Sequence, residues 1–187
     1  TELRKIIYDI AGGIEGDKSF KALHLGGPSG YILPAEFLDT PANFENLKSI
    51  SAILGNGGLI VLNEETCIVA LVKYFMDFMQ KKSCGKCIPC REGTRRMSEI
   101  LENITKKPVV ENSHTTLERF KGVMQRESLA SVMKDTSLCG LGKTAANPVI
   151  SSLKYFREEY GEHIFNRNGN ANICSELRTY YINIDLC

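Results

Sequence analysis

Three cysteines lie close together in the stretch SCGKCIPCREG, residues 83–93. Two residues separate Cys84 from Cys87, and two separate Cys87 from Cys90. A disulfide would leave one of the three thiols without a partner. Structural zinc usually takes two separated C-x2-C pairs, whereas a C-x2-C-x2-C loop can wrap three corners of a [4Fe-4S] cubane. The spacing therefore favours an iron–sulfur cluster, with zinc as the alternative.

A cubane needs a fourth ligand, and the best candidate is Cys139 in the stretch SLCGLGKTAANP. It lies between two predicted helices, where a turn could return it to the first three cysteines. Its neighbours Gly140 and Gly142 permit close approach of the backbone. The alternative is that Cys139 is a small buried apolar residue, as many free cysteines are.

Charged groups near the cysteines could favour an anionic cluster. One helix is predicted to begin near Cys90 and another near Asn147, so helix N-termini would point toward the cluster. Arg91, Arg95 and Arg96 follow the cysteine loop. They could offset the negative charge of a cluster or form an ordinary solvated face, and the sequence leaves both open.

The other residues that could do chemistry show no recognisable pattern. Cys67, Cys174 and Cys187 do not pair in any obvious way, and Cys67 is expected in the core because it begins an apolar helix. The histidines have no carboxylate at triad or metal-ligand spacing, so each is predicted to be structural or solvated. These are His24, His114 and His163.

Composition excludes several classes of function. The 23 basic and 22 acidic residues nearly cancel, and no basic run with aromatics predicts nucleic-acid binding. No stretch reaches the ~18–20 apolar residues that span a membrane. There is no signal-peptide pattern, and seven cysteines fit a complete disulfide framework poorly. We therefore expect a reducing compartment, the cytoplasm.

The first 65 residues predict a mixed α/β unit. Leu3, Ile6, Ile7 and Ile10 share one face of a helix, which Gly12 and Gly13 would end. The stretch FKALHLGG predicts a strand, GGPSGY a turn, and GGLIVLNEE a buried strand.

Residues 66–165 predict four amphipathic helices in a small bundle, because the apolar residues change to a helical period. Residues 108–116 would be a connector, the third helix could restart at Ser128, and Asn147 would cap the fourth before Pro148. The tail 166–187 ends with strand character. The predicted apolar stripes are Val69, Val72, Phe75, Met76 and Met79; Met97, Ile100, Leu101 and Ile104; Leu117, Phe120, Val123 and Met124; and Val149, Ile150, Leu153, Phe156 and Tyr160.

Two stretches, SCGKCIPCREGTRRM and SLCGLGKTAANPV, resemble the C-terminal half of the NADH-binding flavoprotein subunit of respiratory complex I. The same block occurs in NAD(P)-reducing hydrogenases and NAD-linked formate dehydrogenases. LGGPSGYILP and ISAILGNGGLIVLNEETC resemble the soluble-ligand-binding β-grasp domain of that family. The resemblance implies an α+β fold: a partial β-grasp domain (1–65), a four-helix 4Fe-4S domain (66–165) and the start of a truncated ferredoxin-like domain (166–187).

By this resemblance Cys84, Cys87, Cys90 and Cys139 ligate one [4Fe-4S] cluster, and Cys187 begins a further cluster motif. The function implied is electron relay from a flavin within an oxidoreductase. FMN and NAD(P)H would bind only to an upstream domain that this chain lacks, so the isolated chain should not oxidise NADH. The interval around KKPVVENSHTT is longer than usual for the family, and the tail favours the hydrogenase or formate-dehydrogenase branch.

The partners implied are other redox subunits: a 2Fe-2S thioredoxin-like subunit and a hydrogenase or dehydrogenase catalytic subunit. We expect a cytoplasmic protein, or one associated with a membrane through a complex. The competing hypothesis is a zinc-stabilised interaction or ligand-binding module without redox activity.

Overall fold

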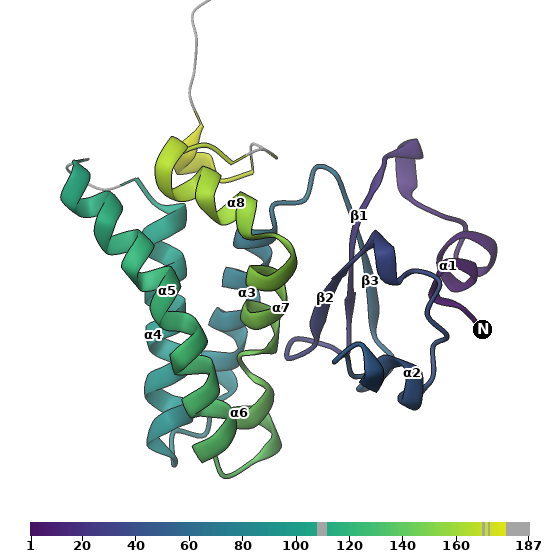
Figure 1. The fold of residues 1–187 in the computed structure, drawn as a ribbon, viewed down its shortest axis with the longest axis horizontal. Coiled ribbons are helices and arrows are strands. Elements are labelled where there is room, and N and C mark those ends of the chain that lie inside the picture. The colour runs from purple at the N-terminus through teal and green to yellow at the C-terminus, as the bar shows by residue number, and fades with distance from the viewer. Residues whose placement is uncertain (108–111, 170, 172, 179–187) are drawn as a thin grey trace, which may run out of the picture.

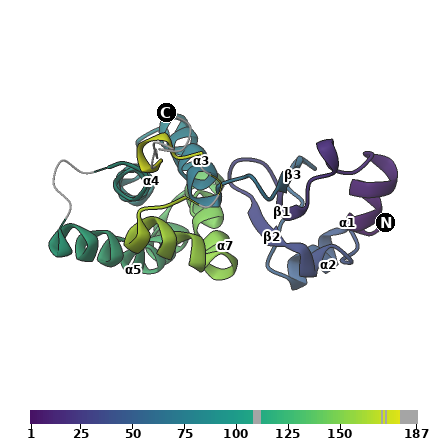
Figure 2. The same cartoon turned by 90° about the horizontal axis from the view of Figure 1, so that it is seen from above.

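The computed structural model describes residues 1–107, 112–169, 171 and 173–178. A small sheet with short helices lies on one side of the molecule, and longer helices lie on the other (Figures 1 and 2). The predicted α+β class is confirmed by this mixture of helices with an antiparallel sheet. The strand predicted at the end of the tail, and Cys187, lie outside the described residues.

The sheet has the strand order β2-β1-β3, and both pairings are antiparallel. Its strands are β1 (Phe20–Leu25), β2 (Tyr31–Pro34) and β3 (Leu59–Asn63). The predicted strands occur in FKALHLGG and GGLIVLNEE. However, β3 is not buried as predicted, because it is an edge strand in this sheet and 46% of Ile60 is exposed to solvent.

Short helices cover the face of the sheet that points away from the long helices (Figure 1). The predicted N-terminal helix is present, and Leu3, Ile7 and Leu47 belong to one buried cluster with β1 and β2 side chains. The elements are α1 (Leu3–Lys5), a π-helical turn (Ile6–Ile10), two 3-10 turns (Glu15–Asp17 and Ala35–Phe37) and α2 (Phe44–Ser49).

The helical region follows β3 directly. The stripes predicted for its first two helices are buried, which confirms those faces. The elements are α3 (Ile68–Lys82), α4 (Ile88–Thr105), α5 (Ser113–Thr136), α6 (Gly140–Thr144), α7 (Asn147–Tyr155), α8 (Arg157–Gly161), a π-helical turn (Glu162–Asn166) and a 3-10 turn (Ser175–Leu177).

The prediction for the third helix, α5, is partly wrong. It begins at Ser113, inside the predicted connector, where Asn112 forms a capping box, and it continues through Ser128 without a break. Three of the four predicted core residues are 41% to 48% exposed, because α5 buries a different face, on which the fully buried Arg126 lies against the ring of Tyr160. The exposed three are Leu117, Phe120 and Met124; the buried face is Arg119, Val123, Arg126, Ala130 and Met133.

The predicted fourth helix is interrupted at Phe156, where the backbone leaves helical geometry, and α8 then follows. Asn147 is not the N-cap but the first residue of α7. Its side-chain amide instead donates a hydrogen bond of 3.0 Å to the carbonyl of Ser29, in the glycine-rich turn of the sheet. The Ser151 hydroxyl accepts the N–H of Ile32 at 2.9 Å, so α7 joins the helices to the edge of β2.

A buried histidine also connects the sheet to the helices. His24 on β1 stacks on Phe75 of α3 with 4.3 Å between ring centroids, and none of its ring is exposed. Neither ring nitrogen has a hydrogen-bond partner among the described residues. Burial lowers the pKa of His24 from 6.5 to about 4, so the folded protein holds this ring neutral.

The neutral His24 predicts a loss of stability in mild acid. Below pH 6.5 the unfolded chain takes up a proton that the folded chain refuses until about pH 4. Urea unfolding should show the free energy of unfolding falling by about 2 kcal/mol from this group between pH 7 and pH 5. The variant His24→Gln, which has no such proton to bind, should show a flatter dependence over this range; an equal slope in both proteins would contradict the prediction.

Candidate metal centre

The four predicted ligands come together at one end of the helical region. Cys84 and Cys87 lie in the link from α3 to α4, Cys90 lies in the first turn of α4, and Cys139 immediately precedes α6. Figure 1 shows this link and α6 at the same, lower end of the long helices. Helix α4 runs away from this end and α5 returns to it, which brings Cys139 to the other three cysteines.

Local backbone geometry explains the shape of the cysteine loop. Gly85 has a φ of 72°, the left-handed region that favours glycine, and this turns the chain between Cys84 and Cys87. The Arg91 guanidinium donates a hydrogen bond of 2.8 Å to the carbonyl of Gly85 and so closes the loop onto α4. Cys87 is the N-cap of α4, and Pro89 lies in its first turn.

The second cysteine segment lies directly on the first because of one glycine. A Cβ atom on Gly142 would lie 3.1 Å from the Cβ of Cys90 and 2.6 Å from the Cβ of Ser137. Both distances are shorter than ordinary side-chain contacts, so the backbone of α6 fills the space beside Cys90. Cys139 is the N-cap of α6, which places both Cys87 and Cys139 at starts of helices.

The surroundings shift the pKa values of two of these thiols, Cys87 and Cys90. The backbone N–H of Leu138, next to Cys139, lowers the pKa of the Cys87 thiol. Burial raises the pKa of the Cys90 thiol, and repulsion from Cys87, Cys139 and Cys84 raises it further. Four thiols this close would be difficult to ionise together without a cation between them.

The four predicted ligands differ in their exposure to solvent. Cys90 is 3% exposed and Cys87 is half-buried, whereas Cys84 and Cys139 are exposed. The alternative in which Cys139 is a small buried apolar residue therefore does not hold. The apolar side chains of Ile88 and Leu138 next to the site are also exposed, at 65% and 82%.

The arginines that follow the loop divide between two roles. Arg95 and Arg96 form ion pairs with Glu99 at 3.0 Å and 3.2 Å and remain mostly exposed. They form the solvated face that the sequence left open. Arg91 pairs with Glu92 at 2.9 Å while it also holds Gly85, so its role is to position the cysteine loop.

The residues at this end fit a [4Fe-4S] cluster. One zinc ion with Zn–S bonds of about 2.3 Å would bring its sulfurs to about 3.8 Å from one another. Among the described residues, three ligand atoms lie within 4.8 Å of one another only at Cys67, His163 and Cys174. The wider arrangement of Cys84, Cys87, Cys90 and Cys139 suits a larger cluster. The buried hydroxyl of Ser137, which has no partner among the described residues, is a donor available to it.

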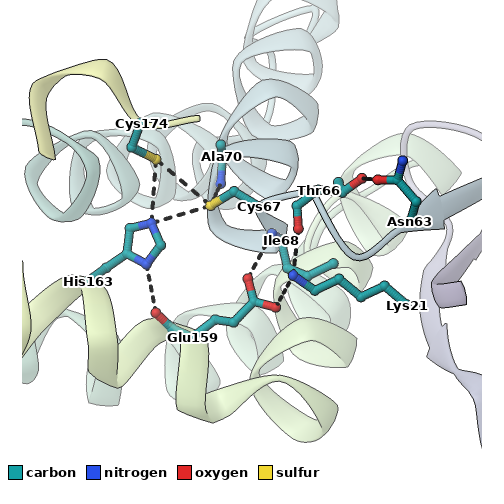
Figure 3. A network of polar contacts seen from close by, with 9 residues as sticks. All are labelled: Lys21, Asn63, Thr66, Cys67, Ile68, Ala70, Glu159, His163 and Cys174. Atoms are coloured by element: carbon teal, nitrogen blue, oxygen red, sulfur yellow. Dashed lines mark hydrogen bonds and ion pairs between the residues drawn. The ribbon is translucent and has the colours of Figure 1, made fainter. Parts of the chain in front are cut away.

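A second group of possible metal ligands consists of Cys67, His163 and Cys174, and Figure 3 shows it near the start of α3. Sequence reasoning missed this second group. The Sγ of Cys67 lies 3.3 Å from Nε2 of His163 and 3.8 Å from Sγ of Cys174, and the last two atoms are 3.4 Å apart. Cys67 was predicted to be core and His163 structural or solvated. No local signal could have joined them, because 96 residues separate these two and 107 separate the two cysteines.

The second group is well supported by its neighbours (Figure 3). Nδ1 of His163 lies 2.7 Å from the carbonyl oxygen of Glu159, and the Glu159 carboxylate pairs with Lys21 at 2.7 Å. Burial works against protonation of His163, but the contact with Cys67 raises its pKa. Two thiols and an imidazole are donors that zinc accepts, so zinc found in this protein need not lie at the four-cysteine end.

The described part of the chain includes no helix with both the length and the apolar character needed to cross a membrane. The family described as "NADH-ubiquinone oxidoreductase-F iron-sulfur binding region" matches residues 70–163. This match covers most of α3 and all of α4 to α8, and therefore all four predicted ligands. The chain belongs to this family, which makes it an iron–sulfur protein.

Similar proteins agree with this assignment. The chain is 41% identical to "NADP-reducing hydrogenase subunit HndC" of Solidesulfovibrio fructosivorans, over 99% of this chain and 36% of the relative. It is 37% identical to an NADH-quinone oxidoreductase subunit of Streptomyces coelicolor, over 88% of this chain and 34% of the relative. A solved NAD⁺-reducing [NiFe]-hydrogenase in its H2-reduced state matches 88% of this chain and 26% of its own, with a TM-score of 0.69 and 27% identity. The chain thus spans about a third of the relatives' length.

The contact at Gly142 can be tested against a neighbouring glycine in the same helix. Gly142→Ala should lower the free energy of unfolding by about 1–3 kcal/mol, because its methyl group has no space beside Cys90. Gly140→Ala is the matched control, since nothing lies within 4 Å of a Cβ there. Anaerobic urea unfolding measures both, and equal effects of the two substitutions would contradict the close packing of α6 on α4.

Proposed function

We propose that this chain is the electron-relay segment of an NAD(P)H-linked oxidoreductase subunit, and that Cys84, Cys87, Cys90 and Cys139 ligate one [4Fe-4S] cluster. The observation that carries the proposal is the meeting of four thiols where α4 and α6 begin, with Gly142 packed against Cys90. The family's iron–sulfur character supports the same cofactor.

Each part of the site has a physical role in this proposal. When bound, the cluster supplies one-electron transfer without a change of bonding in the protein. The thiolates of the four cysteines hold it, and the N-terminus of α4 favours its negative charge. Buried Cys90 excludes water from one side, while exposed Cys84 and Cys139 keep the other side near the surface. A redox group of a partner could approach from there.

The activity of the whole protein is also a proposal. The relatives are named as NADP-reducing hydrogenase and NADH-quinone oxidoreductase subunits, which supports a nicotinamide cofactor that exchanges electrons with the protein, as acceptor in the first and donor in the second. We infer that a flavin, FMN, delivers electrons from a part of the protein outside this chain. We also infer that a 2Fe-2S thioredoxin-like subunit and a hydrogenase or dehydrogenase catalytic subunit are the partners. The isolated chain should therefore not oxidise NADH.

We also propose a division of the chain into three domains. We propose that residues 1–65 are a partial β-grasp domain, supported by the antiparallel sheet with α2 packed near one face. We propose that residues 66–165 form a four-helix domain, supported by α3, α4, α5 and α7 lying together in both views. Residues 166–187 would begin a ferredoxin-like domain, with Cys187 as its first ligand.

A cytoplasmic location, with attachment to a membrane only through partner subunits, is proposed from the cysteines. All the described cysteines are free, including Cys67 and Cys174, whose sulfurs lie 3.8 Å apart. Free thiols at such proximity suit a reducing compartment.

Iron and acid-labile sulfide analysis after anaerobic reconstitution tests the proposal. The wild-type chain should hold about four irons and about four sulfides, as a cubane requires. Cys139→Ser should lose most of both, because it removes one corner ligand. Cys67→Ser is the matched control: it removes a thiol from the second group and should leave iron and sulfide unchanged.

Zinc must be measured in the same samples, because the competing hypothesis is a zinc-stabilised module. Zinc that disappears in Cys67→Ser belongs to the second group and leaves the proposal intact. One zinc that disappears in Cys139→Ser, with no sulfide in any sample, would overturn the electron-relay function.

A further inference from the structure

Two serine hydroxyls lie near Cys90. The hydroxyl of Ser83 lies 3.3 Å from the Cys90 sulfur and accepts the N–H of Gly85 at 3.3 Å. Because that contact occupies Ser83 as an acceptor, its proton is available for the sulfur. The hydroxyl of Ser137 is different: it is buried and has no hydrogen-bond partner among the described residues.

The location of Ser137 is fixed by its surroundings. It is the C-cap of α5, where its N–H bonds the carbonyl of Met133 at 3.1 Å, and it stands two residues before Cys139. Its Oγ lies 2.7 Å from the point where a Cβ of Gly142 would stand, and the Cβ of Cys90 lies 3.1 Å from that same point. The hydroxyl is therefore buried beside Gly142 of α6 and near Cys90, with 3% of the residue exposed.

A buried hydroxyl without a partner costs free energy that folding rarely leaves uncompensated. The sulfurs of a cluster bound at this end would be acceptors for it. We propose that Ser137 is a positioning residue for electron transfer: its hydroxyl donates a hydrogen bond to a cluster sulfur at the Cys90 corner and raises the reduction potential of the cluster.

The direction of the effect follows from charge. Reduction adds one electron to the sulfurs and irons, and a hydrogen bond to an anionic sulfur is stronger when that sulfur carries more charge. Such a donor stabilises the reduced form more than the oxidised form, so its removal lowers the potential. This inference rests on the proposed cluster at Cys84, Cys87, Cys90 and Cys139.

A redox titration of the reconstituted chain, followed by electron paramagnetic resonance, tests the proposal. For Ser137→Ala, with iron and sulfide as in the wild type, the ratio of reduced to oxidised cluster at fixed ambient potential should fall about tenfold. That change equals a shift of about 59 mV for one electron. Proton ENDOR should also show that an exchangeable proton coupled to the wild-type cluster is lost in the variant.

Two further variants separate this role from general destabilisation. Ser152→Ala removes another fully buried serine hydroxyl, which bonds Tyr160 at 2.7 Å instead, and should leave the potential unchanged. Ser137→Thr keeps a hydroxyl and should restore the wild-type potential and the exchangeable proton. If Ser137→Ala cannot hold the cluster, Ser137→Cys takes its place, and its weaker S–H donor should give a smaller shift in the same direction.

The outcomes distinguish this inference from the function on which it rests. Absence of iron and sulfide in the wild-type chain would overturn the proposed function itself. A loaded variant without the Ser137 hydroxyl that keeps the wild-type potential and exchangeable proton would overturn the role of Ser137 alone.

Discussion

The packing of Gly142 against Cys90 is the contact on which the rest of the site depends. With no side chain at this position, the backbone of α6 lies beside α4, and Cys139 arrives next to the first three cysteines. The long helix α5 must then end just before α6, and its C-cap Ser137 lies next to Gly142. Ligand position, helix length and the buried hydroxyl are thus consequences of one close approach between two segments far apart in the sequence.

Helix α3 connects two groups of thiols with different geometry. Its N-cap is Cys67, which contacts His163 and Cys174, and its other end leads into Cys84. Fifteen helical residues separate the two groups by about 22 Å. The ligand atoms of Cys67, His163 and Cys174 lie within 4.8 Å of one another, as around one ion, whereas no three of the other four cysteines that the structure describes do so. The sheet is attached to the side of these helices, through His24 on Phe75 and through α7.

Much of this architecture could be predicted because local pattern dictates it. The stripes of α3 and α4, strand β1 and the paired cysteine motifs all depend on short-range spacing. The face of α5 could not be predicted, since burial of Arg126 beside Tyr160 depends on a neighbouring helix, at 5.4 Å from guanidinium to ring. The group of Cys67, His163 and Cys174 was missed for the same reason, and so was Asn147, whose amide reaches Ser29 rather than capping its own helix.

The central claim is that the four-cysteine end holds a cluster of several irons rather than one zinc. Crystals of the anaerobically reconstituted chain, measured on either side of the iron and zinc absorption edges, would test it most directly. We expect an iron anomalous signal surrounded by Cys84, Cys87, Cys90 and Cys139, large enough for about four irons. A single zinc peak bound by these four sulfurs, with no iron signal, would contradict the claim.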